Sequence, residues 1–278
     1  MRCADSAPVT VAPLPLVRHA VRLNTTTLLA LLGALALSSP AQAGFIDFGG
    51  FGHGQVIDDQ YLASDGLTIS ADNHSKSFDL AVVFDSSLTS TADDDLEGPG
   101  GRAWAAGNVA ADTVFGNLLI VQENQTGCSD GVCNSPDDQA PPGGDLIFAF
   151  DAEIQSFGFD VVDIESSQAI GARVLFFSGA GPAIATVSFA DFECTVGLFC
   201  DASVDFAGNN SANHLANITA AALGVAGFDR VVVDLNGSGA VDNVRWSSAA
   251  GPQVPEPGLA WLMAPALAML ARRAHRNA

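Results

Sequence analysis

The sequence predicts an all-β protein whose central part is a single antiparallel β-sandwich of jelly-roll type. Roughly ten short segments are rich in β-branched and aromatic residues, and clusters of Gly, Asp, Asn, Ser and Pro separate them. Only residues 214–227 have a helical composition, and we expect one short helix or a turn-rich connection there. Strands without alternating helices favour antiparallel pairing over a parallel sheet.

Three segments show the alternation of a half-buried strand most clearly. Residues 145–151, 155–165 and 229–235 each place every second apolar side chain on one face. These side chains are Leu146, Phe148 and Phe150, then Phe157, Phe159 and Val161, then Val231, Val233 and Leu235. Asn236 and Gly237 predict a hairpin turn after the last of them. Further strands are expected at 65–70, 80–87, 116–124, 172–179 and 183–191.

The charge of the chain excludes one class of partner. The 278 residues include 31 acidic and 11 basic ones, and residues 44–255 hold 29 acidic and 5 basic ones. A body this acidic repels phosphate backbones and anionic lipid headgroups, so we expect no nucleic-acid partner. Cations and neutral sugars remain suitable partners.

The N-terminal part, residues 1–43, is typical of a signal peptide. Arg18 and Arg22 precede an apolar run at 28–37, and small residues follow it. A helix of ten residues is about 15 Å long, half the thickness of a hydrocarbon core, which favours removal over permanent anchoring. We expect cleavage after Ala43, which leaves Gly44 as the new N-terminus.

Export makes the cysteines informative. After removal of the leader, two close couples remain, Cys128 with Cys133 and Cys194 with Cys200. Four cysteines allow three pairings, and the spacing favours the local one, with a disulfide closing each short loop. Neither couple has the short C-x-x-C spacing of a structural zinc site.

Acidic residues supply the candidate metal ligands. Asp93 and Asp95 lie in an acidic loop, and Asp47 is paired by hypothesis with Asp242 because the first and last strands of such sandwiches commonly lie close together. Oxygen ligands on irregular loops suit structural calcium, although no EF-hand order is present. The alternative is a solvated acidic surface without a bound ion.

Catalysis has little support in the sequence. No nucleophile elbow, metalloprotease helix, P-loop or dinucleotide fingerprint occurs. Abundant carboxylates make chance acidic pairs inevitable, so a pair alone does not indicate a glycosidase. We therefore expect a protein without enzymatic activity.

The C-terminal part, residues 251–278, carries a distinctive tail. Pro255, Glu256 and Pro257 form a stiff extended motif, an uncharged, mostly apolar run follows at 258–271, and the tail ends with a cluster of arginines. This order resembles the PEP-CTERM sorting signal of exported bacterial proteins. The resemblance implies recognition of the motif by an exosortase-type processing enzyme, after transient anchoring in the inner membrane by a short transmembrane segment. Pro265 interrupts that segment, which is a departure from the pattern.

The body, residues 44–250, bears a weaker resemblance. The stretches "FIDFGG" and "GSGAVDNVRW" look like the extracellular β-sandwich regions that often precede this signal. Those regions are similar to carbohydrate-binding jelly rolls in which calcium supports the structure. The expectation is a non-catalytic protein of the cell surface or extracellular matrix, associated with exopolysaccharide. The alternatives are an extracellular glycan-active enzyme and a calcium-dependent carbohydrate-binding adhesin.

Overall fold

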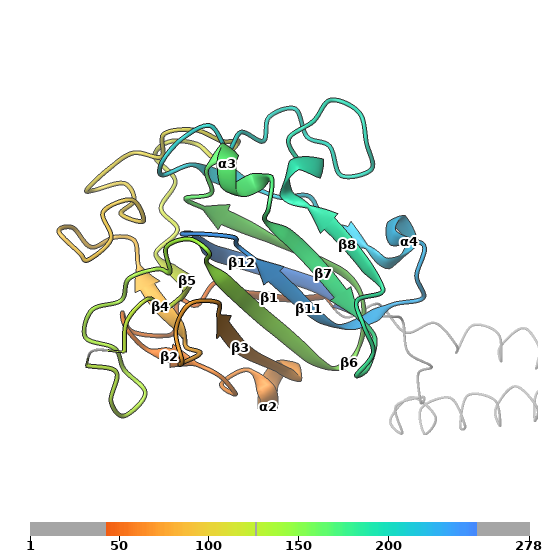
Figure 1. Cartoon of the computed structure of the whole chain (residues 1–278), viewed down its shortest axis with the longest axis horizontal. Coiled ribbons are helices and arrows are strands. Elements are labelled where there is room, and N and C mark those ends of the chain that lie inside the picture. Colours follow the sequence, from red (N-terminus) through yellow and green to blue (C-terminus); the bar gives the residue numbers. More distant parts are fainter. Residues whose placement is uncertain (1–42, 126, 249–278) are drawn as a thin grey trace, which may run out of the picture. The chain divides into compact units, whose positions relative to one another are not determined.

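A computed structural model describes residues 43–125 and 127–248, and the strands dominate this part of the chain (Figure 1). The helices in these two ranges are limited to single turns. In chain order the elements are β1 (Ala43–Ile46), β2 (Val56–Ile57), α2 (Leu62–Asp65), β3 (Leu67–Asn73), β4 (Ala81–Asp85), β5 (Asn117–Val121), β6 (Gly144–Val162), α3 (Ser166–Ala169), β7 (Arg173–Phe177), β8 (Ala185–Ser188), the 3-10 turn η1 (Phe189–Asp191), β9 (Ala212–His214), β10 (Ile218–Thr219), α4 (Ala220–Leu223), β11 (Phe228–Asp234) and β12 (Ala240–Ser248).

Strand β6 is central to the sheet because its two halves pair with different strands. Its first half pairs with β3 and β11, and its second half pairs with β12, β9 and β10. From there the order runs β12, β5, β4, β2 in one direction and β11, β7, β8 in the other. All pairings between these named strands are antiparallel, which confirms the all-β, sandwich-like expectation.

One predicted strand boundary is absent from the structure. The predicted strands 145–151 and 155–165 are one continuous strand of 19 residues, because the backbone stays extended through the exposed residues Asp151, Ala152 and Glu153. Because these exposed residues interrupt the apolar alternation, the sequence pattern stops there although the strand continues. In the stretch 214–227, the helix is limited to Ala220–Leu223 and ends at the left-handed Gly224.

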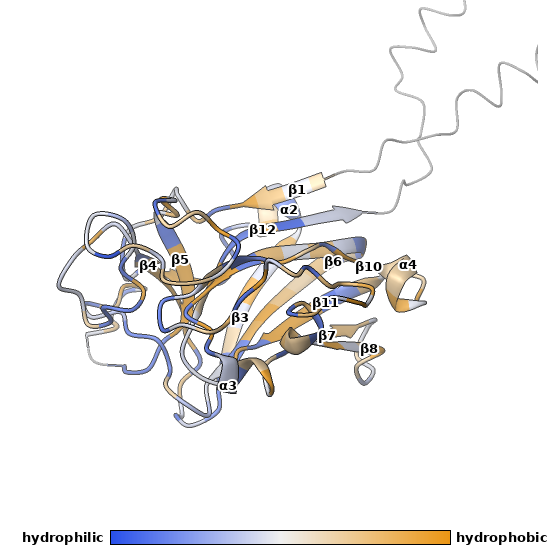
Figure 2. Ribbon diagram, turned by 90° about the horizontal axis from the view of Figure 1, so that it is seen from above, coloured by the Kyte–Doolittle hydropathy of each residue, from blue (hydrophilic) through white to orange (hydrophobic). Residues whose placement is uncertain are grey.

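The main core is formed by apolar side chains of β6 and of the strands around it. The side chains predicted to face inward from 145–151, 155–165 and 229–235 are all buried in it. Phe157 is at its centre, with ring centroids 5.3 Å from Phe148 and 5.7 Å from Phe159. Figure 2 shows the hydrophobic colouring concentrated on β6 and its neighbouring strands, whereas the connecting loops are mostly polar.

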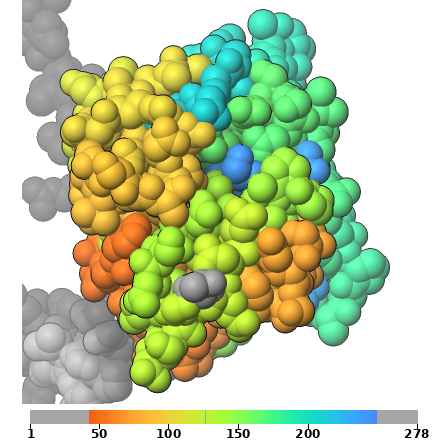
Figure 3. All heavy atoms as spheres, turned by 60° about the vertical axis from the view of Figure 1, so that its left-hand side comes forward, coloured from red at the N-terminus to blue at the C-terminus, as the bar shows by residue number. Residues whose placement is uncertain are grey.

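A second apolar cluster covers the other face of β4, β5 and β12. Val82, Phe84, Leu118 and Ile120 point into it, and Trp104 from the long β4–β5 loop closes it. The loop is held by backbone hydrogen bonds to residues 210–212, including Ala212 N–H to Ala106 O at 2.8 Å. In Figure 3 the yellow β4–β5 loop lies directly against the cyan segment that contains these residues. Both faces of this half-sheet are therefore buried.

Two predicted segments lie outside the described residues. They are the signal peptide upstream of Ala43 and the sorting tail at 251–278. Within 43–125 and 127–248, no helix is both long and apolar enough to cross a membrane.

Candidate functional site

The strongest candidate site lies where the first and last strands meet. Strand β1 pairs with β12 so that Ile46 is opposite Val244, which places Asp47 beside the irregular segment between Asp242 and Arg245. Asn243 has a positive φ of 49° in this segment, so the strand locally loses its regular alternation. Asp242 is the last residue paired before the shift in register, and it lies opposite Asp160 on β6. The sequence prediction that Asp47 and Asp242 lie close together is consistent with this register.

Asp242 is a buried carboxylate with no hydrogen-bond donor. The residue is 1% exposed, and neither Oδ1 nor Oδ2 has a partner in hydrogen-bonding geometry among the described residues. Burial, together with the charges of Asp160 and Asp47, raises the pKa of Asp242 to about 8; the Asn243 N–H, which is near the carboxylate but not in hydrogen-bonding geometry, partly opposes the rise. A buried charge without a partner is strongly unfavourable, so this carboxyl needs either a proton or a cation.

Asp47 and Asp242 both lie close enough to the Tyr61 phenol to act on it through their charges. Asp47 Oδ1 accepts a hydrogen bond from the Gly49 N–H at 3.0 Å, which fixes the carboxylate at the end of β1. Burial, together with the charges of Asp47, Asp65 and Asp242, raises the pKa of Tyr61 to about 12. The negative charges of both aspartates thus act on one phenol. A cation between Asp47 and Asp242 would relieve this repulsion.

The loop after β1 is held rigidly. Phe48 is fully buried with a φ of 55°, and Asn117 Nδ2 donates hydrogen bonds to Phe48 O and Phe51 O, both at 2.8 Å. The "FIDFGG" stretch therefore presents Asp47 from a fixed loop. Calcium takes six to eight oxygens at about 2.3–2.6 Å, so two carboxylates would supply part of the shell, with carbonyl groups or water supplying the rest.

The basic side chains near Asp242, those of Arg245 and His214, interact with the carboxylate of Asp160. Asp160 accepts hydrogen bonds from Arg245 Nη1 at 3.1 Å and Asn243 Nδ2 at 2.9 Å, and its Oδ1 lies 2.7 Å from His214 Nδ1. Asp160 therefore has its counter-charge, whereas Asp242 has none among the described residues. Of these two neighbouring carboxylates, Asp242 is therefore the one that requires an external partner.

The other two candidate ligands, Asp93 and Asp95, have different partners in the structure. Asp95 forms an ion pair with Arg102, and its N–H donates to Asp93 Oδ1 at 3.0 Å. Asp93 instead lies with Asp137 and Asp138, whose carboxylate oxygens are within 4.8 Å of one another. Asp93 Oδ2 is buried without a hydrogen-bond partner among the described residues.

In the acidic cluster of Asp93, Asp137 and Asp138, the last residue is buried and the other two are half-buried. Burial and the charges of Asp93 and Asp163 raise the pKa of Asp138 well above its usual value. Burial raises the pKa of Asp163 to about 7 and that of Asp137 to about 6, and nearby carboxylates add to both shifts. The cluster joins loops that are far apart in sequence, so spacing along the chain could not have shown that Asp93 meets Asp138.

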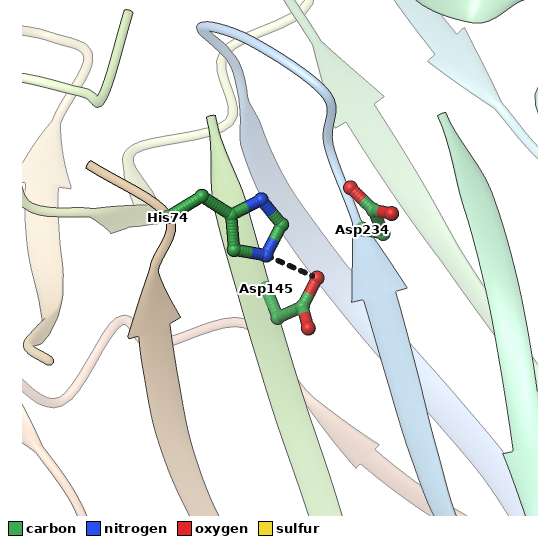
Figure 4. Close-up of side chains that lie close together, drawn as sticks. All are labelled: His74, Asp145 and Asp234. Carbon is green, nitrogen blue, oxygen red and sulfur yellow. Dashed lines mark ion pairs between the residues drawn. The ribbon is translucent and has the colours of Figure 1, made fainter. Parts of the chain in front are cut away.

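A third group, His74, Asp145 and Asp234, was not singled out from the sequence. Asp145 on β6 is directly opposite Asp234 on β11, and Figure 4 shows His74 directed at Asp145, with Nε2 at 3.3 Å from Oδ1. Arg173, opposite Asp234 on β7, donates from Nε to Asp234 Oδ2 at 2.9 Å. Asp234 therefore has a counter-charge from Arg173, and Asp145 has one when His74 is protonated. Asp145 and Asp234 meet through the register of β6 and β11, and this register is a tertiary property that the sequence pattern does not show.

The cysteines pair as expected. Disulfides join Cys128 to Cys133 and Cys194 to Cys200, each closing one loop. Ala43 and Gly44, at the predicted cleavage point, lie in β1, and Gly44 is opposite Trp246. Cleavage there remains a prediction, as does the role of Pro255, Glu256 and Pro257, which lie outside the described residues.

Comparisons with known proteins do not name a family for this chain. No family model matches it, and no curated protein matches it. A solved structure of infectious bursal disease virus, Gx strain, is similar over 79% of this chain and 60% of that one, with 12% identity and a TM-score of 0.22. The chain thus spans less than two thirds of the viral protein, and a likeness this weak carries no argument about fold or function.

Proposed function

We propose that the chain is a non-catalytic exported protein of the cell surface or extracellular matrix, with a jelly-roll sandwich stabilised by calcium. The observation that carries the calcium part is the buried Asp242 carboxylate, which has no donor among the described residues and lies beside Asp47. A divalent cation held between them would neutralise both groups and tie the first strand to the last. The ion has a structural role in this proposal.

Export is supported by the two disulfides and by the acidic surface. Disulfides persist in oxidising compartments outside the cytoplasm. A strongly negative net charge of −20 keeps such a protein soluble and away from anionic partners. Neutral exopolysaccharide is compatible with this charge, and we propose it as the material with which the protein associates.

Sorting is assigned to the tail. We propose that an exosortase-type enzyme recognises Pro255, Glu256 and Pro257 while the apolar run holds the chain in the inner membrane. The interrupting Pro265 makes this run a weak permanent anchor, which favours later release. The protein would then reach the cell surface or the surrounding matrix.

The experiment that tests the calcium site compares melting curves in chelator and in millimolar calcium. A ligand at 100 times its dissociation constant adds about 2.7 kcal/mol of stability, which raises Tm by several degrees. We expect this gain for the parent and its loss for Asp242→Asn. The matched control is Asp112→Asn, which changes an exposed carboxylate in the β4–β5 loop and should keep the full calcium effect. Equal melting curves of the parent with and without calcium would contradict the proposal.

A further inference from the structure

A pocket opens at the edge of the sandwich where β1 begins and β12 ends. Its volume is about 290 Å³, which is near the lower end for small-molecule sites and large enough for a sugar residue. Figure 2 shows β1, α2 and β12 close together in this region. The pocket is distinct from the calcium site, since neither Asp47 nor Asp242 lines it. The side chains that the argument uses are those of Ser64, Asp65, Phe150, Asp151 and Trp246.

Two aromatic rings give the pocket an apolar part. The ring centroids of Phe150 and Trp246 are 5.4 Å apart, and both side chains belong mainly to the core. Gly44 lies against the indole, and a Cβ there would come within 2.1 Å of the Trp246 ring atoms Cε2 and Cζ2. Glycine at this position therefore allows the backbone of β1 to approach the ring without displacing it.

Two carboxylates give the pocket its polar part. Asp65 and Asp151 are held on either side of Gly66, which has a φ of 63° and accepts a hydrogen bond from the Asp151 N–H at 2.7 Å. The positive φ favours glycine at this position, and a Cβ there would lie 3.3 Å from Asp151 Cβ. Ser64 Oγ donates to Asp65 Oδ2 at 2.7 Å and orients that carboxylate.

The charge of the lining restricts the ligand. None of the described residues that line the pocket is basic, and two of them are acidic. An anionic ligand would be repelled by this pair and by the acidic body. Carboxylates accept strong hydrogen bonds from hydroxyl groups, and ring edges suit the C–H surface of a sugar.

We propose that this pocket binds a neutral sugar residue of a polysaccharide. Asp65 and Asp151 accept hydrogen bonds from its hydroxyl groups, and Trp246 and Phe150 contact its apolar C–H surface. The proposal rests on the proposed association with exopolysaccharide and names the place and the chemistry of that contact. It also explains why the pocket combines aromatic and acidic groups without a cationic partner.

Tryptophan fluorescence of the full exported protein is the direct test, with neutral gluco- and manno-oligosaccharides as probes and uronic-acid oligosaccharides as the anionic comparison. At least one neutral oligosaccharide should change the emission, and the anionic ones should not. Trp246→Phe should abolish the change, and Trp104→Phe should keep it, because Trp104 lies in the second apolar cluster. Calorimetry should show affinity weakened about tenfold in both Asp65→Asn and Asp151→Asn, the loss of a hydrogen bond to a charged group.

Two outcomes would contradict the proposal that this pocket binds a neutral sugar. One is the absence of a fluorescence or heat signal with every neutral oligosaccharide at millimolar concentration. The other is unchanged affinity in Trp246→Phe, Asp65→Asn and Asp151→Asn. The calcium effect on Tm, measured in the same variants, separates the two proposals. Asp65→Asn and Asp151→Asn should keep the calcium effect on Tm. Loss of glycan binding without loss of that effect would therefore not contradict the calcium site.

Discussion

Replacing Asp242 by asparagine should remove a specific part of the pH dependence of stability. The folded-state pKa of Asp242 is raised from its usual 3.8 to about 8, so between these values the folded state binds more protons than the unfolded state. Stability without calcium therefore falls as pH rises, and each pH unit costs about 1.4 kcal/mol. Between pH 5 and pH 7 the single carboxyl accounts for about 3 kcal/mol, or roughly 6–12 °C in Tm.

The assay is thermal unfolding in chelator across this pH range. Asn has the shape of the protonated acid but cannot ionise, so the parent and Asp242→Asn should have similar Tm at pH 5, and the variant should be the more stable at pH 7. Asp138 and Asp163 shift stability in the same direction, but they are unchanged in the variant and cancel in the difference. Equal pH slopes for the parent and Asp242→Asn would refute the reasoning, since the carboxyl would then titrate as an ordinary one.

Three further outcomes are expected. The mass of the exported protein should place its N-terminus at Gly44, and a protein that retains residues 1–43 would contradict the cleavage site. Non-reducing peptide mapping should recover Cys128 with Cys133 and Cys194 with Cys200, and replacing either couple by serines should cost about 2 kcal/mol, because each closes only a short loop. Replacing Pro255, Glu256 and Pro257 by alanines should trap an unprocessed, membrane-retained form in the native host; the same mature mass and distribution as the parent would reduce the tail to an anchor.

The parts of the fold that could be predicted are those encoded by local alternation. Leu146, Phe148 and Phe150 alternate with half-exposed residues, and the pattern reports directly on a half-buried strand. The continuity of β6 could not be read in this way, because the exposed residues between its halves mark a change of partner strands and not an end of the strand. The second apolar cluster was equally hidden, since Trp104 reaches it from a long loop without periodicity.

The candidate site, too, could be predicted from the sequence only in part. Asp47 and Asp242 could be paired in advance because they lie at the first and last strands, whose proximity is a general feature of such sandwiches. That Asp242 has no donor could not be predicted, because it depends on the irregular segment at Asn243 and on the use of Arg245 by Asp160. Asp93 was named with Asp95 as a candidate ligand of the acidic loop, and the folded chain places it beside Asp138 as well.

The central claim is that Asp47 and Asp242 hold a calcium ion, and counting bound calcium by calorimetric titration tests it most directly. The full chain should be titrated alongside Asp47→Asn, Asp242→Asn and the control Asp112→Asn at a pH near 8, where proton competition for Asp242 is reduced. We expect Asp112→Asn to bind as many ions as the parent and Asp242→Asn to bind one fewer, with Asp47→Asn showing weaker binding at that site. The same stoichiometry and affinity in the parent and in Asp242→Asn would contradict the claim.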